Sequence, residues 1–248
     1  MLVALGTVIL ILVALQALSI AHSGLIFPSV PDIFGNLIRI FSTFGFYSDM
    51  AATLIRIFAG FAVVLLSSVS MAIASCRCNM FHSVVATFMA IVKATPLASI
   101  ALILFFFMKS GMIPSFAAFL LAFPMMFTYV RDSFLSLDRN LIALCDIYEV
   151  KGFRRLVLFY LPSLAPAIVS SSKAALSLII KVVISSEILV YVRHGIGRRI
   201  EDASLMLDAS MVFAWTIVAV LLCVLSDAAF GFLERKLIGF GLIEGKSK

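Results

Sequence analysis

The sequence predicts an all-α membrane protein with about six transmembrane helices in a single membrane domain, residues 1–248. Of its 248 residues, 63% are apolar and 13% are charged, and the mean hydropathy is +1.17. Soluble domains are about 45–50% apolar and about 25% charged, so a water-soluble globule is excluded. The apolar residues form continuous runs of bilayer-crossing length and do not alternate as in barrel strands, which favours helices.

Six apolar runs are long enough to be expected to cross a bilayer of ordinary thickness. These predicted spans are residues 2–21, 50–75, 83–108, 112–130, 164–192 and 209–233. The first is uncharged and lacks the basic start and small-residue cleavage site of a secretory signal, so we expect a retained helix. The amphipathic segment 37–46 is too short to cross.

The distribution of basic residues predicts the orientation of the chain. Connections on the N-terminal side of the membrane hold ten lysines and arginines, and those on the other side hold five. Basic connections stay in the cytoplasm, so both termini and the polar segment 131–161 are expected there. The net charge of +6 is explained by this topology and does not indicate nucleic-acid binding. The four cysteines show no paired spacing that would predict a disulfide framework.

The polar segment 131–161 has the features of a docking element. Helix-forming residues flank a basic break at residues 151–155, and Pro162 ends the segment. This pattern predicts two short surface helices that meet at Gly152.

The segment resembles the cytoplasmic Glu-Ala-Ala loop of binding-protein-dependent ABC import permeases, in which a short coupling helix enters a cleft of the ATPase subunit. Counting back from Pro162, Ala143-Leu144-Cys145 stands where the family has Glu-Ala-Ala, and Glu149 stands where it has glycine. The chain therefore departs from the family pattern at both places.

Further segments are similar to the nitrate/sulfonate/taurine-type branch of these permeases and occur in the same order. They are Phe27-Pro-Ser-Val-Pro31, Thr53-Leu-Ile-Arg-Ile-Phe-Ala-Gly-Phe61, Lys93-Ala-Thr-Pro96, Glu187, Gly195-Ile-Gly197, and Asp227 with Glu234-Arg235. Each match is weak alone, and their order and spacing over nearly the whole chain indicate the family.

This resemblance implies an ABC importer type I permease fold in the inner membrane, with a cytoplasmic coupling helix between helices 4 and 5. It further implies a second permease subunit, homodimeric or related, an ATPase subunit dimer that binds ATP and magnesium, and a periplasmic or lipoprotein substrate-binding protein. The chain itself would bind no cofactor and catalyse no reaction. The expected ATPase-coupling residues are Leu144, Cys145, Asp146, Tyr148, Glu149, Lys151, Gly152, Phe153 and Arg154.

Charged side chains inside the predicted spans are costly unless they meet a cavity, a partner or the membrane surface. Arg56 is close enough to one end of its span to reach the outer surface, and Lys173 can reach the cytoplasmic side. Lys93 and Lys181 lie near the middle of their spans, where they either line the pathway or have a structural role. Pro96 removes a helix hydrogen bond beside Lys93 and predicts a kink.

The fifth span carries polar residues every fourth position, a spacing that places them on one helix face. This stripe could guide an anion, although the small residues nearby could equally serve close helix packing. Glu187 is either a partner for a cation on another helix or a gating acid. The candidate pathway residues are Lys93, Thr95, Pro96, Lys173, Ser177, Lys181 and Glu187.

Other motifs do not indicate chemistry carried by this chain. Cys76-Arg-Cys78 with His82 lacks a fourth ligand for zinc and is interpreted as a reduced cytoplasmic turn. Residues 241–247 resemble a phosphate loop, but only three residues separate the glycines instead of four.

The expected function is import of a small polar solute, with the cations favouring a sulfonate, taurine or nitrate over a thiamine precursor. An ATP-independent secondary transporter or channel is the alternative. A membrane enzyme or assembly factor is disfavoured because no catalytic constellation converges.

Overall fold

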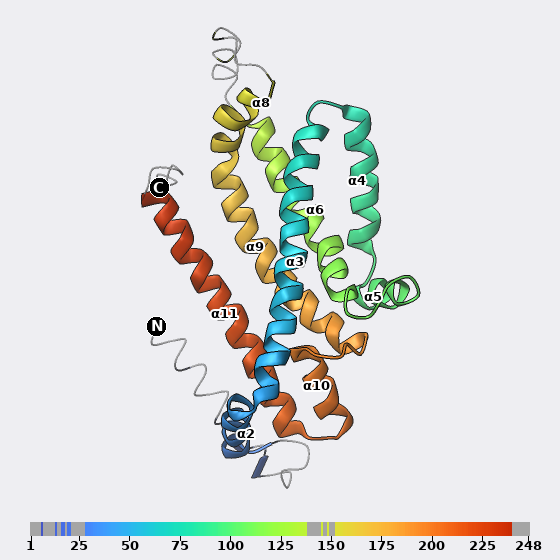
Figure 1. The fold of residues 1–248 in the computed structure, drawn as a ribbon, viewed down its shortest axis with the longest axis vertical. Helices are drawn as coiled ribbons and strands as arrows, with labels where there is room; N and C mark the ends of the chain where they lie inside the picture. The colour runs from blue at the N-terminus through green and yellow to red at the C-terminus, as the bar shows by residue number, and fades with distance from the viewer. Residues whose placement is uncertain are drawn as a thin grey trace.

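The computed structural model describes residues 28–137 and 152–239, together with a few isolated positions: Gly6, Val13, Gln16, Ala17, Ser19, Ile20, Cys145 and Tyr148. Within this part of the chain the regular structure is helical. The long helices run side by side, and shorter helices pack at one end (Figure 1).

The first two described helices meet at a short polar turn. Helix α2 (Val30–Ser42) is capped by Ser29, whose hydroxyl accepts a hydrogen bond from the backbone N–H of Asp32. Helix α3 (Phe44–Ser75) follows after Thr43 and extends the full length of the molecule. It begins six residues before the predicted span 50–75 and ends at the predicted position.

The predicted span 83–108 is not one straight helix. Helix α4 (Asn79–Ala94) and helix α5 (Leu97–Phe105) are bent by 102° relative to each other. Thr95 between them is extended, as expected for a residue that precedes proline, and Pro96 caps α5. The predicted kink at Pro96 is therefore present, and it is large enough to divide the span in two.

Helix α6 (Ile113–Leu135) forms the centre of the core and packs most extensively against α3 and α9. One face consists of fully buried residues that recur at helical spacing, including Ala118, Ala122 and Met126. On α3, Gly60 allows close approach, because a Cβ there would lie 3.2 Å from the carbonyl oxygen of Ser115. The predicted fourth span 112–130 begins at the N-cap of this helix and ends five residues before the helix does.

The fifth predicted span is preceded by an irregular turn. Helix α8 (Gly152–Arg155) leads through the π-helical turn η1 (Leu156–Tyr160) into helix α9 (Leu161–Leu189). Pro162 has no N–H to donate to the carbonyl four residues earlier, and the helix widens into a π-helical turn just before it. Gly152 has a φ of +59°, in the left-handed region that favours glycine.

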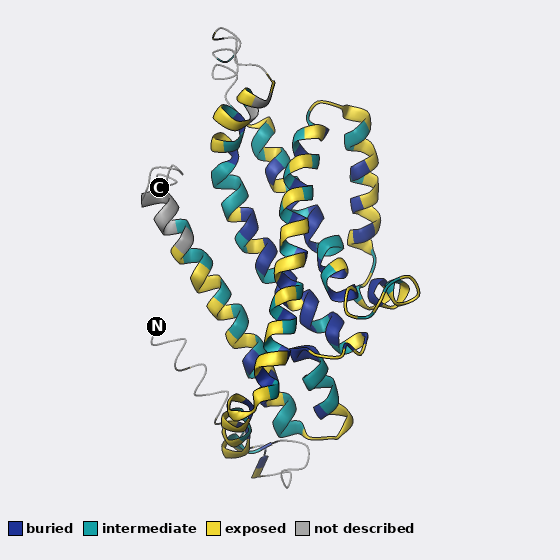
Figure 2. Ribbon diagram, viewed as in Figure 1, coloured by how far each residue is buried: buried dark blue, intermediate teal, exposed yellow. Residues whose placement is uncertain are grey.

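The chain ends in a short helix and a long one. Helix α10 (Ile196–Leu205) lies across the end of the bundle, and helix α11 (Ala209–Gly239) returns along α9. Figure 2 shows that α11 is mostly intermediate or exposed, whereas α6 and α9 carry more buried residues than any other described helix. In the isolated chain, α11 therefore leaves apolar surface for lipid or for other subunits.

Four described helices are long and apolar enough to cross a membrane, and a fifth crossing results if α4 and α5 form one bent span. The predicted first span, residues 2–21, lies outside the described residues apart from isolated positions. Helix α8 and the end of α3 lie at one end of the molecule, and α2 and α10 lie at the other (Figure 1). We refer to these as the α8 end and the α10 end.

Candidate functional site

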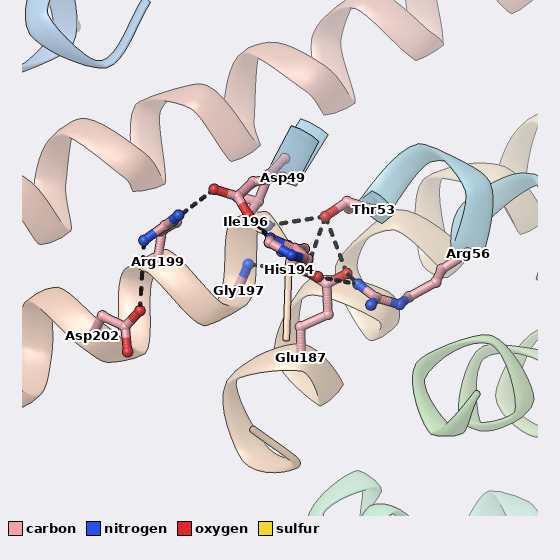
Figure 3. A network of polar contacts seen from close by, with 10 residues as sticks. Asp49, Thr53, Arg56, Glu187, His194, Ile196, Gly197, Arg199 and Asp202 are labelled. Atoms are coloured by element: carbon pink, nitrogen blue, oxygen red, sulfur yellow. Dashed lines mark hydrogen bonds and ion pairs between the residues drawn. The ribbon is translucent and has the colours of Figure 1, made fainter. Parts of the chain in front are cut away.

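A network of polar contacts joins three helices at the α10 end. Figure 3 shows that α3 and α9 contribute the side chains of Thr53, Arg56 and Glu187, which meet the chain at the start of α10. Together with Asp49 and the backbone of residues 194–197, these three side chains form what we call the brace. The α3 residues are spaced by four and three positions, which places them on one helix face.

Glu187 is the centre of the brace and is fully buried. Arg56 Nη1 donates to its Oε1 at 2.6 Å, and the Thr53 hydroxyl lies 3.0 Å from both carboxylate oxygens. The backbone N–H of Gly197 donates to Oε2 at 2.9 Å. Both oxygens of the buried carboxylate thus have donors, which offsets the cost of removing its charge from water.

The guanidinium of Arg56 is also held by backbone carbonyls. Nη1 donates to the carbonyl of His194 at 2.7 Å, and Nε donates to that of Gly111 at 3.1 Å. The side chain is only 13% exposed. Arg56 therefore has protein partners at the α10 end: a buried carboxylate on another helix and two carbonyls outside the helices. Pairing of Glu187 with a cation on another helix is confirmed.

Two glycines make room for the Glu187 side chain. A Cβ at Gly195 would lie 2.6 Å from Oε2, and one at Gly197 would lie 2.5 Å from the Glu187 Cβ. A side chain at Gly195 would displace the carboxylate, and one at Gly197 would collide with the Glu187 Cβ and the backbone of α9. The segments at residues 53–61, 187 and 195–197, which are far apart in the sequence, therefore contribute to a single structure.

Asp49 extends the brace to α10. Its Oδ2 accepts from Arg199 Nε at 2.6 Å, and its Oδ1 accepts from the backbone N–H of Gly195 at 3.2 Å. His194 Nδ1 lies 3.3 Å from the same Oδ1. Asp49 is buried, so these contacts fix the start of α10 against α3. The brace resembles no catalytic arrangement, and its evident effect is to join α3, α9 and α10 rigidly.

A cavity of about 590 Å³ lies beside the brace, between α2, α10 and the starts of α3 and α11. Its lining includes Trp215 and the oppositely charged side chains of Arg39, Arg199 and Asp202. Arg199 already contacts Asp49 and Asp202. The cavity is therefore open at the surface of the α10 end, and some of its charged side chains already pair with other groups of the protein.

A second cavity, of about 380 Å³, lies between α9 and α11, and a few polar and charged side chains interrupt its largely apolar lining. We call it the α9–α11 groove. It is lined by Ser177, Lys181, Ile184, Ser185, Thr216, Ala219, Val220, Cys223, Val224 and Asp227. Two of the predicted pathway residues, Ser177 and Lys181, therefore face α11.

Lys173 also points toward α11. Its Nζ lies 3.9 Å from the position that a Cβ would take at Gly231, one turn beyond Asp227. The four-residue stripe of α9, from Lys173 to Ser185, thus faces a matching stripe of α11. Sequence analysis identified the first stripe and matched Asp227 to the family, and only the fold shows that the two are adjacent.

The predicted pathway residues near the bend lie elsewhere. Lys93 is exposed in the last turn of α4, where a cation is favourable near the carbonyl end of the helix. The Thr95 hydroxyl donates to the carbonyl of Ile91 at 2.8 Å. Helix α4 packs on α6 and α3, on the opposite side of the bundle from α11 (Figure 1). The structure therefore does not bring Lys93 and Lys181 together, and Lys93 is near a helix end because Pro96 stops α4.

Most predicted ATPase-coupling residues fall outside the described part of the chain: Leu144, Asp146, Glu149 and Lys151. Of the others, Cys145 is half-buried, Tyr148 is 76% exposed, and Gly152 and Arg154 are exposed at the start and within α8. Phe153 belongs to α8, and its side chain is outside the description. These α8 residues lie at the end of the molecule opposite the brace (Figure 1).

Sequence reasoning missed the roles of Asp49, Arg199 and Asp202. The signal was present in part, because Asp49, Thr53 and Arg56 follow helical spacing at the start of an apolar run. Their partners lie about 140 residues away, and no local pattern predicts which segment they meet.

The described helices, four of them long and apolar enough to cross a membrane, define a multi-pass membrane protein. The family model of the "binding-protein-dependent transport system inner membrane component" matches residues 79–239. The chain belongs to this family. It is thus a permease subunit of an ABC importer, a multi-pass membrane component and not an enzyme, and its family works with ATPase and binding-protein partners.

A solved structure has the same fold. A chain from the inward-facing MetNI methionine ABC transporter, in its CY5 native crystal form, aligns with a TM-score of 0.64 and 16% identity. The alignment covers 84% of this chain and 99% of that one. This likeness establishes the type I permease fold. No curated protein sequence matches the chain significantly.

Proposed function

We propose that this permease forms the membrane pathway for a small anionic or anion-bearing solute, as in the nitrate/sulfonate/taurine-type branch. The observation that carries this proposal is the placement of Lys173 and Lys181 on one face of a spanning helix beside a cavity. Cations within a membrane helix are maintained where they meet water or a partner. A thiamine precursor delivered by the binding protein is the second candidate, because related permeases carry such heterocycles.

The α8 end is proposed as the cytoplasmic, ATPase-facing end. Residues 144–154 would dock on an ATPase dimer that holds ATP and magnesium, and this chain would bind no cofactor itself. The exposed Arg154 in α8 supports the proposal, as do the five lysines and arginines of residues 131–161. Both termini would then be cytoplasmic, and the α10 end would receive solute from the extracytoplasmic binding protein.

In the same proposal, a second permease subunit, either another copy or a related chain, completes the pathway. Movement of the ATPase pair reaches α9 through α8 and η1, which precede it directly in the chain. The bend between α4 and α5 at Thr95 and Pro96 is a second place where the pathway changes shape.

The decisive experiment is gentle extraction of the tagged chain, identification of its partners by mass spectrometry, and uptake by the reconstituted complex. A stoichiometric ATPase and ATP-dependent uptake are expected. Glu149→Lys, or deletion of residues 145–151, should abolish this uptake while the helices still insert. Normal ATP-driven uptake by either variant would contradict the docking role, and uptake by the chain alone in ATP-free vesicles would favour a secondary transporter.

A further inference from the structure

We infer that the α9–α11 groove is a binding position for a small zwitterion, with Lys181 contacting its anionic group and Asp227 its ammonium group. This inference rests on the proposed function and specifies the class of solute. Both side chains line the same cavity of about 380 Å³, a size within the range of small-molecule sites. They come from two different spanning helices, so the groove exists only in the folded protein.

The two charges are exposed to the groove and are not paired within the described part of the chain. Lys181 and Asp227 are both exposed, and no ion pair or hydrogen bond joins either to another described residue. The thiol of Cys223 lines the same groove. Two charges of opposite sign, unpaired within the described residues, therefore share one largely apolar groove within the membrane-spanning region, where each is costly without a partner.

Hydroxyl groups lie one helical turn on either side of Lys181. Ser177 and Ser185 line the groove, and within the described residues their hydroxyls make no hydrogen bond with a protein group. The Thr216 hydroxyl donates to the carbonyl of Val212 at 2.7 Å and keeps only acceptor capacity. The two serines can thus donate to a sulfonate or carboxylate that is held by Lys181.

The charge pattern selects against ions of a single sign. A simple anion would be attracted by Lys181 and repelled by Asp227, and a simple cation would be attracted by Asp227 and repelled by Lys181. A solute with one anionic group and one ammonium group a few bonds apart can contact Lys181 on α9 and Asp227 on α11 at the same time.

Cys223 provides a direct reporter of the groove. In the intact importer in nanodiscs, Cys76, Cys78 and Cys145 are replaced by serine, and the rate of Cys223 modification by charged methanethiosulfonate reagents is measured by mass spectrometry. Competitors are the zwitterions 2-aminoethanesulfonate and 3-aminopropanoate, with ethanesulfonate and ethylammonium as matched ions of one charge. The rate of Cys223 modification is measured without ATP turnover or uptake. A negative result is therefore distinguishable from failure of the proposed function.

Charged reagents should reach Cys223, and the zwitterions should protect it about tenfold better than either single-charge ion. Lys181→Gln should remove the protection, and Asp227→Asn should make ethanesulfonate as protective as the zwitterions. Lys109→Gln, an exposed cation in the turn after α5, is the matched control and should change nothing.

Three outcomes would overturn the inference. Absence of Cys223 modification by charged reagents would mean that the groove is closed to water. Equal protection by ethanesulfonate and 2-aminoethanesulfonate in the otherwise unsubstituted groove would define a plain anion site. Protection that survives both Lys181→Gln and Asp227→Asn would place the solute elsewhere. The comparison of competitors needs neither variant, so it decides the matter even if a variant fails to fold.

Discussion

Two charged residues on α9, Glu187 and Lys181, differ in whether other described groups of the protein bind their charges. Glu187 has donors on both carboxylate oxygens from α3 and the start of α10, whereas Lys181, about 9 Å earlier along the helix, faces the groove with no described partner. The first charge is satisfied by the protein itself, so its contribution is structural. The second is left for something that the folded chain does not supply. A charge in a membrane helix indicates function only after its partners are known.

The largest effect should come from breaking the brace. Glu187→Ala would leave Arg56 and the Gly197 N–H without their partner in a buried place, so we expect a loss of about 3–5 kcal/mol in the free energy of unfolding. Thermal unfolding of the purified protein in detergent measures this loss. Glu201→Gln is the control, because Glu201 only accepts an exposed contact from Tyr191, and it should change stability by less than about 0.5 kcal/mol.

A smaller loss should follow from crowding the brace. Gly197→Ala would place a methyl group against the Glu187 Cβ and the carbonyl of Ile184, at a cost of about 1–3 kcal/mol. Gly35→Ala is the matched control, because the added Cβ meets nothing within 4 Å and α2 gains a better helix former. Equal unfolding temperatures for the two variants would contradict the close approach seen at the start of α10.

The stability that Asp208 contributes at the N-terminus of α11 should depend on pH. Helix α11 forms one side of the groove. Hydrogen bonds from the Ser210 hydroxyl and the Met211 N–H hold the pKa of Asp208 below its ordinary value. Its stabilising effect is complete above the unfolded pKa of about 4 and is lost as the pH falls through the lower folded pKa. Asp208→Ala should cost about 1 kcal/mol at neutral pH. In pH-dependent thermal unfolding, the variant should lose less stability than the parent in acid.

The smallest effect on stability should come from substituting Lys181 in the groove. Lys181→Gln removes a charge that has no described partner, so the free energy of unfolding should change by less than about 0.5 kcal/mol or increase. The same thermal measurement in detergent tests this. A loss comparable to that of Glu187→Ala would show that Lys181 has a structural partner, and the contrast between the two positions on α9 would disappear.

The helical class and most helix positions could be predicted from the sequence because continuous apolar runs reflect the membrane directly. The bend was signalled by Pro96, but its angle of 102° depends on how α5 packs against α6 and α9. At the brace, the sequence indicated that Glu187 needed a cation from another helix. It could not identify Arg56, because helical spacing contains no information on which of several helices becomes a neighbour.

The same limitation applies to the groove. The stripe from Lys173 to Ser185 was visible as a four-residue repeat, and Asp227 was visible as an isolated charge in the last span. Their adjacency arises from the antiparallel return of α11 along α9, which is a property of the fold. Residues 138–151, in the middle of the predicted coupling segment 131–161, lie outside the description apart from Cys145 and Tyr148, so that part of the prediction stays a prediction.

The separation of Arg56 from Glu187 along the chain has a consequence for synthesis. The two residues are 131 positions apart. At about 5–20 residues per second, α3 enters the membrane on the order of 10 s before its carboxylate partner has been made. During that interval the arginine must extend to the lipid headgroups or remain within the insertion machinery. Arg56 on the newly made α3 therefore has no carboxylate partner until α9 has been synthesised. Chains truncated between α3 and α9 should be degraded faster than the full chain.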